Sequence, residues 1–477
     1  MIKLIIFSAL LPIVFAGCTS TNPELAFDDV NKTVTARTGQ TVQWSRHNSA
    51  SNDVANAIEP LLKTNLTAQA AVTIALLNNR SLQAEFDEIG ISQADLAQAS
   101  RLRNIEIVGS WRFPDRPPSL VDAEYSAAVN FLDLLTLPMR KKNAALNLEQ
   151  IKLRVADSVL QLASETQTAF YTLQAGEALV KRLSVSVAIN AATADLAQRQ
   201  YDAGNINELE LQNQQAAFTQ AQLDFMQAQA QTRVKREHLN RLLGLSGAQV
   251  NWKVDDDLPM LPEQEPVLAN LEMLAVNQRL DLAAARSQAE SVAAVLRLKK
   301  KTRFIPGITV GVDTERNTDG QRVTGPSLGL ELPLFDQGQP ALARLAAQYR
   351  QVQNNYAALE VNIRSEVRQM QGALLAARTT AEHYRKTLLP QRQKILHQTL
   401  LQYNAMQKNS YDLLAAKERE QIAERGYIEA LRDYWIARAE LERAVGGRLS
   451  RETSPLPAVA EPMKMNSTTP TEQPHNH

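Results

Sequence analysis

The sequence predicts a mainly α-helical protein with a small β part, built from two similar halves. The segment 200–211 returns as 402–413, at a constant offset of 202 residues. Stretches rich in Ala, Gln and Leu run for tens of residues without helix breakers. Each half also has a pair of short segments in which apolar and polar residues alternate, as is typical of strands. A repeat of this length indicates a duplicated half-protein rather than a short solenoid unit.

The composition excludes several classes of protein. The chain has 477 residues, with 51 basic and 51 acidic side chains and zero formal net charge, so there is no electrostatic case for nucleic-acid binding. Aromatic residues make up only 5%, which favours thin layers of long helices. No Ser, His and Asp set is marked by a local motif, and Gly446-Gly447 lacks the context of a phosphate loop. We therefore expect no enzyme activity and no cofactor.

The N-terminus predicts secretion and a lipid anchor. Residues 1–17 contain one basic residue, an apolar segment too short to span a bilayer, and two small residues at the end, which predicts a signal peptide. Cys18 follows directly and is the only cysteine, so it has no intrachain disulfide partner. The segment resembles a bacterial lipoprotein signal, which implies a covalent lipid such as palmitate on Cys18. The alternative is an ordinary signal peptide followed by an incidental free thiol.

The first part of the mature chain has no clear period. Residues 18–65 are polar, and we expect an irregular, lipidated N-terminal segment. After residue 18 no apolar run approaches the ~20 residues of a membrane-spanning helix. If the chain crosses a membrane, it must do so with strands closed into a barrel, because lipid cannot satisfy open backbone groups.

The first half, residues 66–250, combines both periodicities. Ile107, Gly109 and Trp111 place apolar or small residues on alternate positions, which predicts a strand with one apolar and one polar face. Pro138 marks a helix start, since Pro is tolerated in the first turn. The predicted order is a helix at 66–103, strands at 105–113 and 125–134, a long helix from Pro138 to Ala203 and a helix from Asn207 to Leu243.

The second half, residues 268–447, repeats this order. The predicted elements are a helix at 268–301, strands at 307–315 and 325–333, a long helix from Pro340 to Tyr403 and a helix ending near Val445. In each half the two shorter helices sum to about the length of the long one, so we expect them to lie end to end alongside it. A Pro-containing linker, residues 251–267, joins the halves, and the tail 448–477 is expected to be disordered.

With this repeated order, the chain resembles an outer-membrane efflux factor of the TolC family, and most closely its heavy-metal RND efflux subgroup of lipoproteins. The resemblance covers nearly all of the mature chain. Its most specific features are the Tyr-x-Ala-Gly turn at 201–204, the strand-to-helix passage 332–338 and the duplication itself. A weaker counterpart of the passage lies at 131–141. Four strands are too few for a barrel, whereas three copies give twelve.

The resemblance implies a homotrimer with a 12-stranded transmembrane β-barrel in outer-membrane lipid and an α-helical tunnel across the periplasm. A periplasmic adaptor and an inner-membrane RND-type pump dock at the lower end of such a tunnel, which is a passive conduit. Membership of the heavy-metal subgroup implies export of heavy-metal cations. Thr19 stands where an inner-membrane retention signal often has Asp, which favours the outer membrane.

Two other functions stay open. A periplasmic adaptor lipoprotein also has long helical hairpins, but it has one hairpin flanked by β-rich domains. A structural coiled-coil lipoprotein has sustained heptads with apolar a and d positions and needs no alternating strands.

The resemblance places the tunnel tip at the two helical turns, 201–210 and 403–412. Tyr403 and Asp412 fall on family positions that close the pore, and Lys408 falls where an Arg often sits. Threefold symmetry turns Asp412 into a ring of three charges that favours cations and can bind a metal ion. The alternative is a solvated carboxylate on a helix surface. In the first half, Glu210 is the counterpart of Asp412, and Tyr201 and Gly204 form the turn.

Two further features of the tip and tail complete the predictions. Met406 replaces the Gly of the second turn, so we expect Asn404 or Asn409 to adopt the positive-φ conformation instead. No metal site is assigned. Four of the six histidines are isolated, and the other two, His475 and His477, stand in the tail where they could chelate only weakly.

Overall fold

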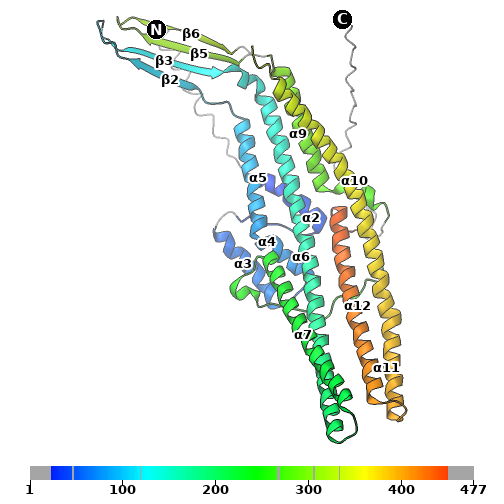
Figure 1. The fold of residues 1–477 in the computed structure, drawn as a ribbon. Helices are drawn as coiled ribbons and strands as arrows, with labels where there is room; N and C mark the ends of the chain where they lie inside the picture. Colours follow the sequence, from blue (N-terminus) through cyan, green and yellow to red (C-terminus); the bar gives the residue numbers. More distant parts are fainter. Residues whose placement is uncertain are drawn as a thin grey trace.

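The computed structural model describes residues 23–45, 48–118, 120–265, 269–304, 307–331 and 334–449. These residues form an elongated helical body with a four-stranded sheet at one end and two helical hairpins at the other (Figure 1). The predicted signal peptide, Cys18 and residues 450–477 of the tail lie outside the described residues.

The first half follows the predicted order with shifted boundaries. Its elements are α4 (Ala68–Asn78), α5 (Arg80–Ala99), β2 (Glu106–Arg112), β3 (Asp122–Asn130), α6 (Phe131–Asp202) and α7 (Glu208–Leu243). The helix predicted at 66–103 is divided at Asn79, whose extended backbone ends α4 and whose side chain accepts a hydrogen bond from the Leu82 amide at 3.0 Å, capping α5.

The start of the long helix differs from the prediction. It begins at Phe131, and Pro138 lies inside it. The reason is Asn130, whose side chain accepts a hydrogen bond from the Leu132 amide at 3.0 Å and so provides an N-cap before the proline is reached. The second strand, predicted to run to residue 134, consequently ends at Asn130.

The second half has the same elements. They are α8 (Leu271–Gln278), α9 (Leu280–Thr302), β5 (Gly307–Arg316), β6 (Arg322–Glu331), α10 (Gln339–His383), the π-helical segment η3 (Tyr384–Leu388), α11 (Leu389–Asn404) and α12 (Ser410–Val445). The segment η3 has a local cause. Pro390 has no amide N–H and its ring clashes with the carbonyl four residues earlier, so the preceding hydrogen bond widens, from the Leu389 amide to the Tyr384 carbonyl.

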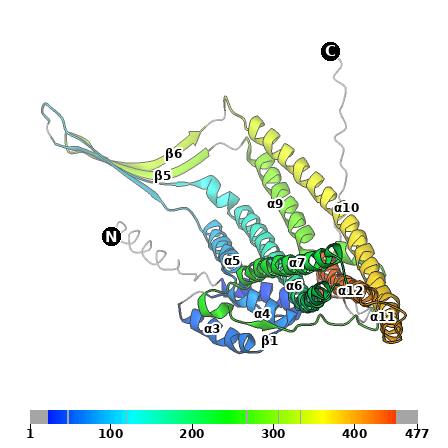
Figure 2. The same ribbon diagram turned by 60° about the horizontal axis from the view of Figure 1, so that its bottom comes forward.

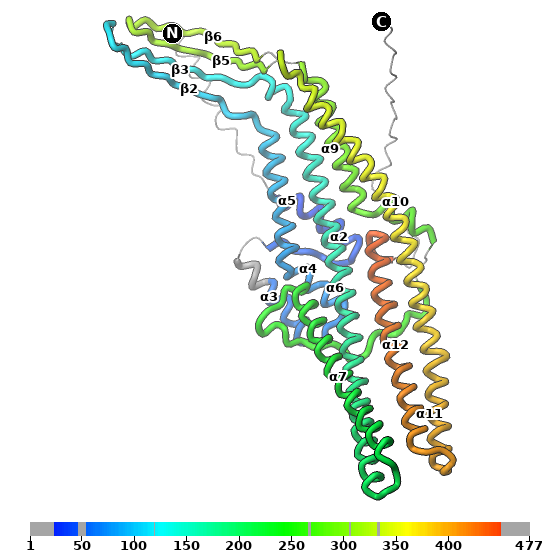
Figure 3. The backbone as a smooth tube through the Cα atoms, in the orientation of Figure 1, coloured from blue at the N-terminus to red at the C-terminus, as the bar shows by residue number. Residues whose placement is uncertain are grey.

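In each half the shorter helices lie along one long helix, as expected from their lengths (Figures 1 and 3). Helices α5 and α7 pack on successive parts of α6, and α9 and α12 pack on the combined α10–α11 rod. Helix α12 also packs on α6, which joins the two halves. Among the described residues, no helix combines the length and the apolar character needed to cross a lipid bilayer.

The N-terminal segment was predicted to be irregular, and this is wrong. It contains α2 (Glu24–Thr38) and α3 (Asn48–Lys63), which lie beside the middle of the body (Figure 1). Figure 2 shows α3 next to α4. Phe27, Val30 and Val34 recur at helical spacing in an otherwise polar sequence and are buried against α5 and α6. Packing on the body therefore stabilises α2, although the weak periodicity of its sequence does not predict a helix.

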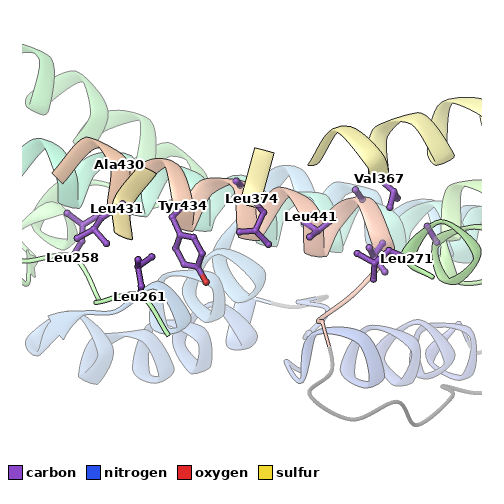
Figure 4. Close-up of a cluster of buried hydrophobic side chains, with 14 of the residues drawn as sticks. Leu258, Leu261, Leu271, Val367, Leu374, Ala430, Leu431, Tyr434 and Leu441 are labelled. Atoms are coloured by element: carbon purple, nitrogen blue, oxygen red, sulfur yellow. The ribbon is translucent and has the colours of Figure 1, made fainter. Parts of the chain in front are cut away.

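The linker between the halves is part of the core. Its strand β4 (Lys253–Val254) pairs in parallel with β1 (Asn65–Leu66). Further along, Leu258 and Leu261 are buried in the cluster that contains Leu431 and Tyr434 of α12 (Figure 4). Burial of each leucine contributes about 2 kcal/mol. The linker thus holds the second half against the first.

The four-stranded sheet is antiparallel throughout, in the order β2-β3-β5-β6, and β3 pairs with β5 across the two halves. Because paired residues share a face and successive residues alternate, the register defines two faces. One face is largely apolar, with Ile107, Gly109, Trp111, Ala123, Tyr125, Ala127, Val129, Ile308, Val310, Val312, Leu328 and Leu330. Thr314, Arg316, Arg322 and Thr324 lie on the same face near the β5–β6 turn. The other is largely polar, with Glu106, Ser110, Arg112, Asp122, Glu124, Ser126, Asn130, Thr309, Asp313, Glu315, Ser327 and Glu331.

Candidate functional site at the helical tips

The two turns at the end of the hairpins have the same backbone structure. In each, two amides bond back to carbonyls of the preceding helix end, which is the usual C-terminal cap with a left-handed residue. The first turn has Gly204 N to Tyr201 O at 2.8 Å and Asn205 N to Gln200 O at 2.8 Å. The second has Met406 N to Tyr403 O at 2.9 Å and Gln407 N to Gln402 O at 2.8 Å. The sequence repeat thus extends to individual hydrogen bonds.

The left-handed residue of the second turn is Met406, with φ +59°, where the first turn has Gly204 with φ +74°. The expectation that Asn404 or Asn409 takes this conformation is wrong. Asn404 is the last residue of α11, and Asn409 has φ −93° because it is the N-cap of α12. The cap fixes where the chain must turn left-handed, and a methionine there costs about 1 kcal/mol.

Both returning helices begin with an asparagine cap. Asn207 accepts from the Glu210 amide and Asn409 from the Asp412 amide, each at 2.9 Å. In the second turn the Asp412 carboxylate also accepts from the Asn409 amide at 3.4 Å, completing a capping box.

The Asp412 carboxylate also has a charged neighbour. Lys408 Nζ lies 3.7 Å from Asp412 Oδ1, and both side chains are nearly half exposed. The structure therefore brings two of the predicted gate residues together. It also gives Asp412 a structural task, since it caps α12 as well as carrying a charge at the tip.

Tyr411 of the second turn senses the charge of Glu210 in the first. Burial raises the pKa of the Tyr411 phenol, and the nearby Glu210 carboxylate raises it further. The Tyr411 hydroxyl is enclosed and has no hydrogen-bond partner among the described residues. Sequence reasoning did not single out Tyr411. The repeat could have drawn attention to it, because the equivalent residue in the first turn is the exposed aliphatic Leu209, so the two turns differ at this position.

Above the turns, a groove of about 440 Å³ separates the first hairpin from α12. Its lining is largely polar and includes Arg182, Asn190, Asn213, Gln214, Asp224, Tyr411, Lys417, Glu418 and Arg425. The two hairpins are linked across it by Arg182 Nη1 and Glu424 Oε2, 3.6 Å apart. A polar groove bridged by a partly exposed ion pair can open at small cost in free energy.

The remaining predicted residues are placed less specifically. Tyr201 and Tyr403 occupy equivalent positions, are both 40% exposed, and contribute backbone carbonyls to the turns. Within the described part of the chain, no group of three or more His, Cys, Asp and Glu side chains is arranged to hold a metal ion.

Known proteins are similar to this chain in sequence or in fold. The cobalt-zinc-cadmium resistance protein CzcC of Cupriavidus metallidurans is 23% identical over 395 residues, which cover 80% of this chain and 90% of the relative. The outer membrane channel CmeC of Campylobacter jejuni matches with a TM-score of 0.70 and 15% identity, covering 81% of this chain and 87% of that one. The outer membrane protein VceC of Vibrio cholerae matches with a TM-score of 0.67 and 16% identity, covering 80% of this chain and 97% of that one.

No protein-family model matches the chain. The fold, the duplicated hairpins and the sequence similarity nevertheless agree with one another. The resemblance predicted from the sequence is confirmed, and the chain has the fold of the TolC-type outer-membrane channels.

Proposed function

We propose that this protein is the outer-membrane channel of a tripartite efflux system, a passive conduit from the periplasm to the exterior. The observation that carries the proposal is the sheet at one end of a long helical body, with one exposed apolar face and one polar face. The apolar face suits lipid and the polar face suits a water-filled passage. A channel of this kind is passive, so the energy for transport comes from an inner-membrane partner.

The sheet also indicates how the protein assembles. In the single chain, β2 and β6 are edge strands with unpaired backbone groups along their outer sides. Unpaired edges are not tolerated in lipid, so the edges of neighbouring copies pair with each other. We propose a homotrimer, with an adaptor protein at the lower hairpins and an RND-type pump below it. A lipid on Cys18 adds a second attachment to the outer membrane.

The proposed substrates are heavy-metal cations. Their support is the similarity over most of the chain to a protein named for resistance to cobalt, zinc and cadmium. The selection of a substrate lies upstream in the pump, so the channel itself needs only a passage compatible with cations. The acidic residues on the polar face of the sheet, among them Asp313 and Glu315, provide one.

We propose that the gate lies at the second turn. In a trimer the three copies of Asp412 form an acidic ring, and Glu210, Tyr403 and Lys408 surround it. The proximity of Lys408 to Asp412 supports a closed state in which the carboxylates are partly neutralised. Lysine contributes charge without the bidentate fork of arginine, so this link is weak and easily released.

The adaptor and the coiled-coil lipoprotein fit the structure less well. An adaptor has one helical hairpin flanked by β-rich domains, whereas the described residues form two hairpins that share a single four-stranded sheet. A coiled-coil lipoprotein gives no account of a sheet with one apolar face.

The test is single-channel conductance of the purified trimer in planar bilayers, before and after Asp412→Ala. We expect discrete, cation-preferring currents that increase severalfold in the variant. Asp412→Asn is the matched control for the capping role, because the amide keeps a hydrogen-bond acceptor for the Asn409 amide but loses the charge. No currents from a trimer shown to be inserted would refute the conduit and favour the adaptor. Currents that neither substitution changes would support the conduit but would show that its gate lies elsewhere.

A further inference from the structure

The apolar face of the sheet ends in an aromatic group at its distal hairpins. Trp111, Phe113 and Tyr125 are exposed there, and Trp111 Nε1 donates a hydrogen bond to the Tyr125 hydroxyl at 3.1 Å. The two rings also meet edge to face, with centroids 5.7 Å apart. Aromatic rings with a polar edge are typical of the boundary between hydrocarbon and headgroups. We therefore infer that this aromatic group marks the boundary between the lipid tails and the headgroups.

Two arginines lie on the same face at this level. In the sheet register, Trp111 is opposite Ala123, Ala123 opposite Arg316, and Arg316 opposite Arg322. These four residues thus form one row across all four strands. Two guanidinium groups directly opposite each other repel, so such a pair is unfavourable without an anion.

Neither arginine is neutralised within the described part of the chain, where no carboxylate lies within ion-pair distance of either side chain. Arg316 donates one hydrogen bond, from Nη2 to the Val121 carbonyl at 3.3 Å, and its Nε has no acceptor. Arg112 gives the contrast. It belongs to the polar face and is paired with Asp122 at 3.4 Å and Glu124 at 3.1 Å.

The arginines border a hollow of about 470 Å³ on the apolar face. Its other lining residues are Trp111, Phe113, Val121, Ala123, Tyr125 and Thr314. The hollow therefore has apolar and aromatic walls on one side and two cationic groups on the other. This combination matches a lipid whose acyl chains lie along the sheet and whose phosphate sits at the rim.

We propose that Arg316 and Arg322 form a binding site for the phosphate of an anionic membrane lipid at the distal rim of the sheet. The inference rests on the proposed function, because it requires the apolar face to lie in a bilayer. Guanidinium groups bind phosphate oxygens in a bidentate manner, and the anion relieves the repulsion between the two arginines. Each trimer carries three such sites.

The experiment uses the full-length trimer reconstituted into liposomes, with flotation as a first step that reports insertion. Retention of phosphatidylglycerol, with phosphatidylcholine as the competitor, is then counted by native mass spectrometry of the extracted trimer. The test variant is Arg316→Gln with Arg322→Gln, and the matched control is Arg112→Gln on the polar face. We expect phosphatidylglycerol affinity to fall at least about tenfold in the double variant and to change less than about twofold in the control.

The outcomes separate this inference from the proposed function. Wild-type trimer that does not float with liposomes would overturn both. Trimer that floats but retains the two lipids equally, or loses phosphatidylglycerol equally in the double variant and the control, would overturn the lipid site alone. Inorganic phosphate that competes at concentrations comparable to the lipid would also overturn it, because the site would then bind free phosphate without using the apolar hollow. Circular dichroism and trimer mass establish that the variants fold.

Discussion

The turns 201–210 and 403–412 are two copies of one structure that carry different chemistry. Their capping hydrogen bonds match residue for residue, and both returning helices start at an asparagine. Within this shared backbone the first turn has Gly204 and Leu209, where the second has Met406 and Tyr411. The comparison teaches that duplication preserved the backbone bonds and left the side chains free to specialise. The second turn acquired a charge pair and a tyrosine whose hydroxyl is enclosed.

The largest expected effect concerns the glycines at the ends of the two returning helices. It tests whether the backbone there is packed equally tightly in both halves. Gly244 and Gly446 end α7 and α12 with φ +67° and +89°. A Cβ on Gly244 would lie 2.6 Å from the Asn78 backbone oxygen, whereas one on Gly446 would lie 3.3 Å from its nearest neighbour. Backbone cannot move aside as a side chain can, so Gly244→Ala should destabilise by about 3 kcal/mol or more and Gly446→Ala by about 1–2 kcal/mol.

The measurement is the midpoint of denaturant unfolding for the two variants under identical conditions. Equal shifts, or a larger shift for Gly446→Ala, would show that close packing at Asn78 does not distinguish the halves.

An exchange at the left-handed position sharpens the comparison of the tips. Met406→Gly should stabilise the turn by about 1 kcal/mol, and Gly204→Met should destabilise the other turn by a similar amount. Neither change meets a steric obstacle, because a Cβ at Gly204 has no neighbour within 4 Å and Met406 is 95% exposed. The reciprocal signs are checked by hydrogen exchange of the turn amides. The same sign in both variants would contradict the equivalence of the two backbones.

Tyr411 provides a third test. Its enclosed hydroxyl has no hydrogen-bond partner among the residues that the structure describes, so Tyr411→Phe should be neutral or stabilising by up to about 1 kcal/mol. Tyr411→Leu, which restores the first-half pattern, should lose packing. Thermal unfolding of the trimer measures both. A clear loss of stability in Tyr411→Phe would mean that the hydroxyl is bonded in the assembled protein, across the groove or between subunits.

The smallest expected effect concerns Lys408. An exposed ion pair at this spacing contributes about 0.3–0.5 kcal/mol, so Lys408→Ala should hardly change stability. Its influence should appear instead in conductance at low salt, where the charge of Asp412 is least screened. Lys408→Arg should restore or exceed the wild-type behaviour. A large loss of stability in Lys408→Ala would give this residue a structural role.

The sequence predicted the order of elements because each has a period or a breaker of its own. Apolar and polar residues largely alternate along the strands, and Gly204 ends its helix. Three features were not predictable from local pattern. Asn130 starts α6 before Pro138, and α2 is helical through packing on distant helices. Tyr411 lines a groove together with Asn213 and Gln214 of the other hairpin. Local rules describe elements, whereas these features arise where elements meet.

The most direct test of the account is a side-by-side measurement of single-channel conductance for Asp412→Asn and Glu210→Gln. Both substitutions remove one charge from equivalent positions of the same backbone. If the second turn has specialised as the constriction, Asp412→Asn should raise the conductance and reduce cation preference severalfold, and Glu210→Gln should change either by less than about twofold. Equal effects of the two substitutions, or a larger effect of Glu210→Gln, would contradict the account.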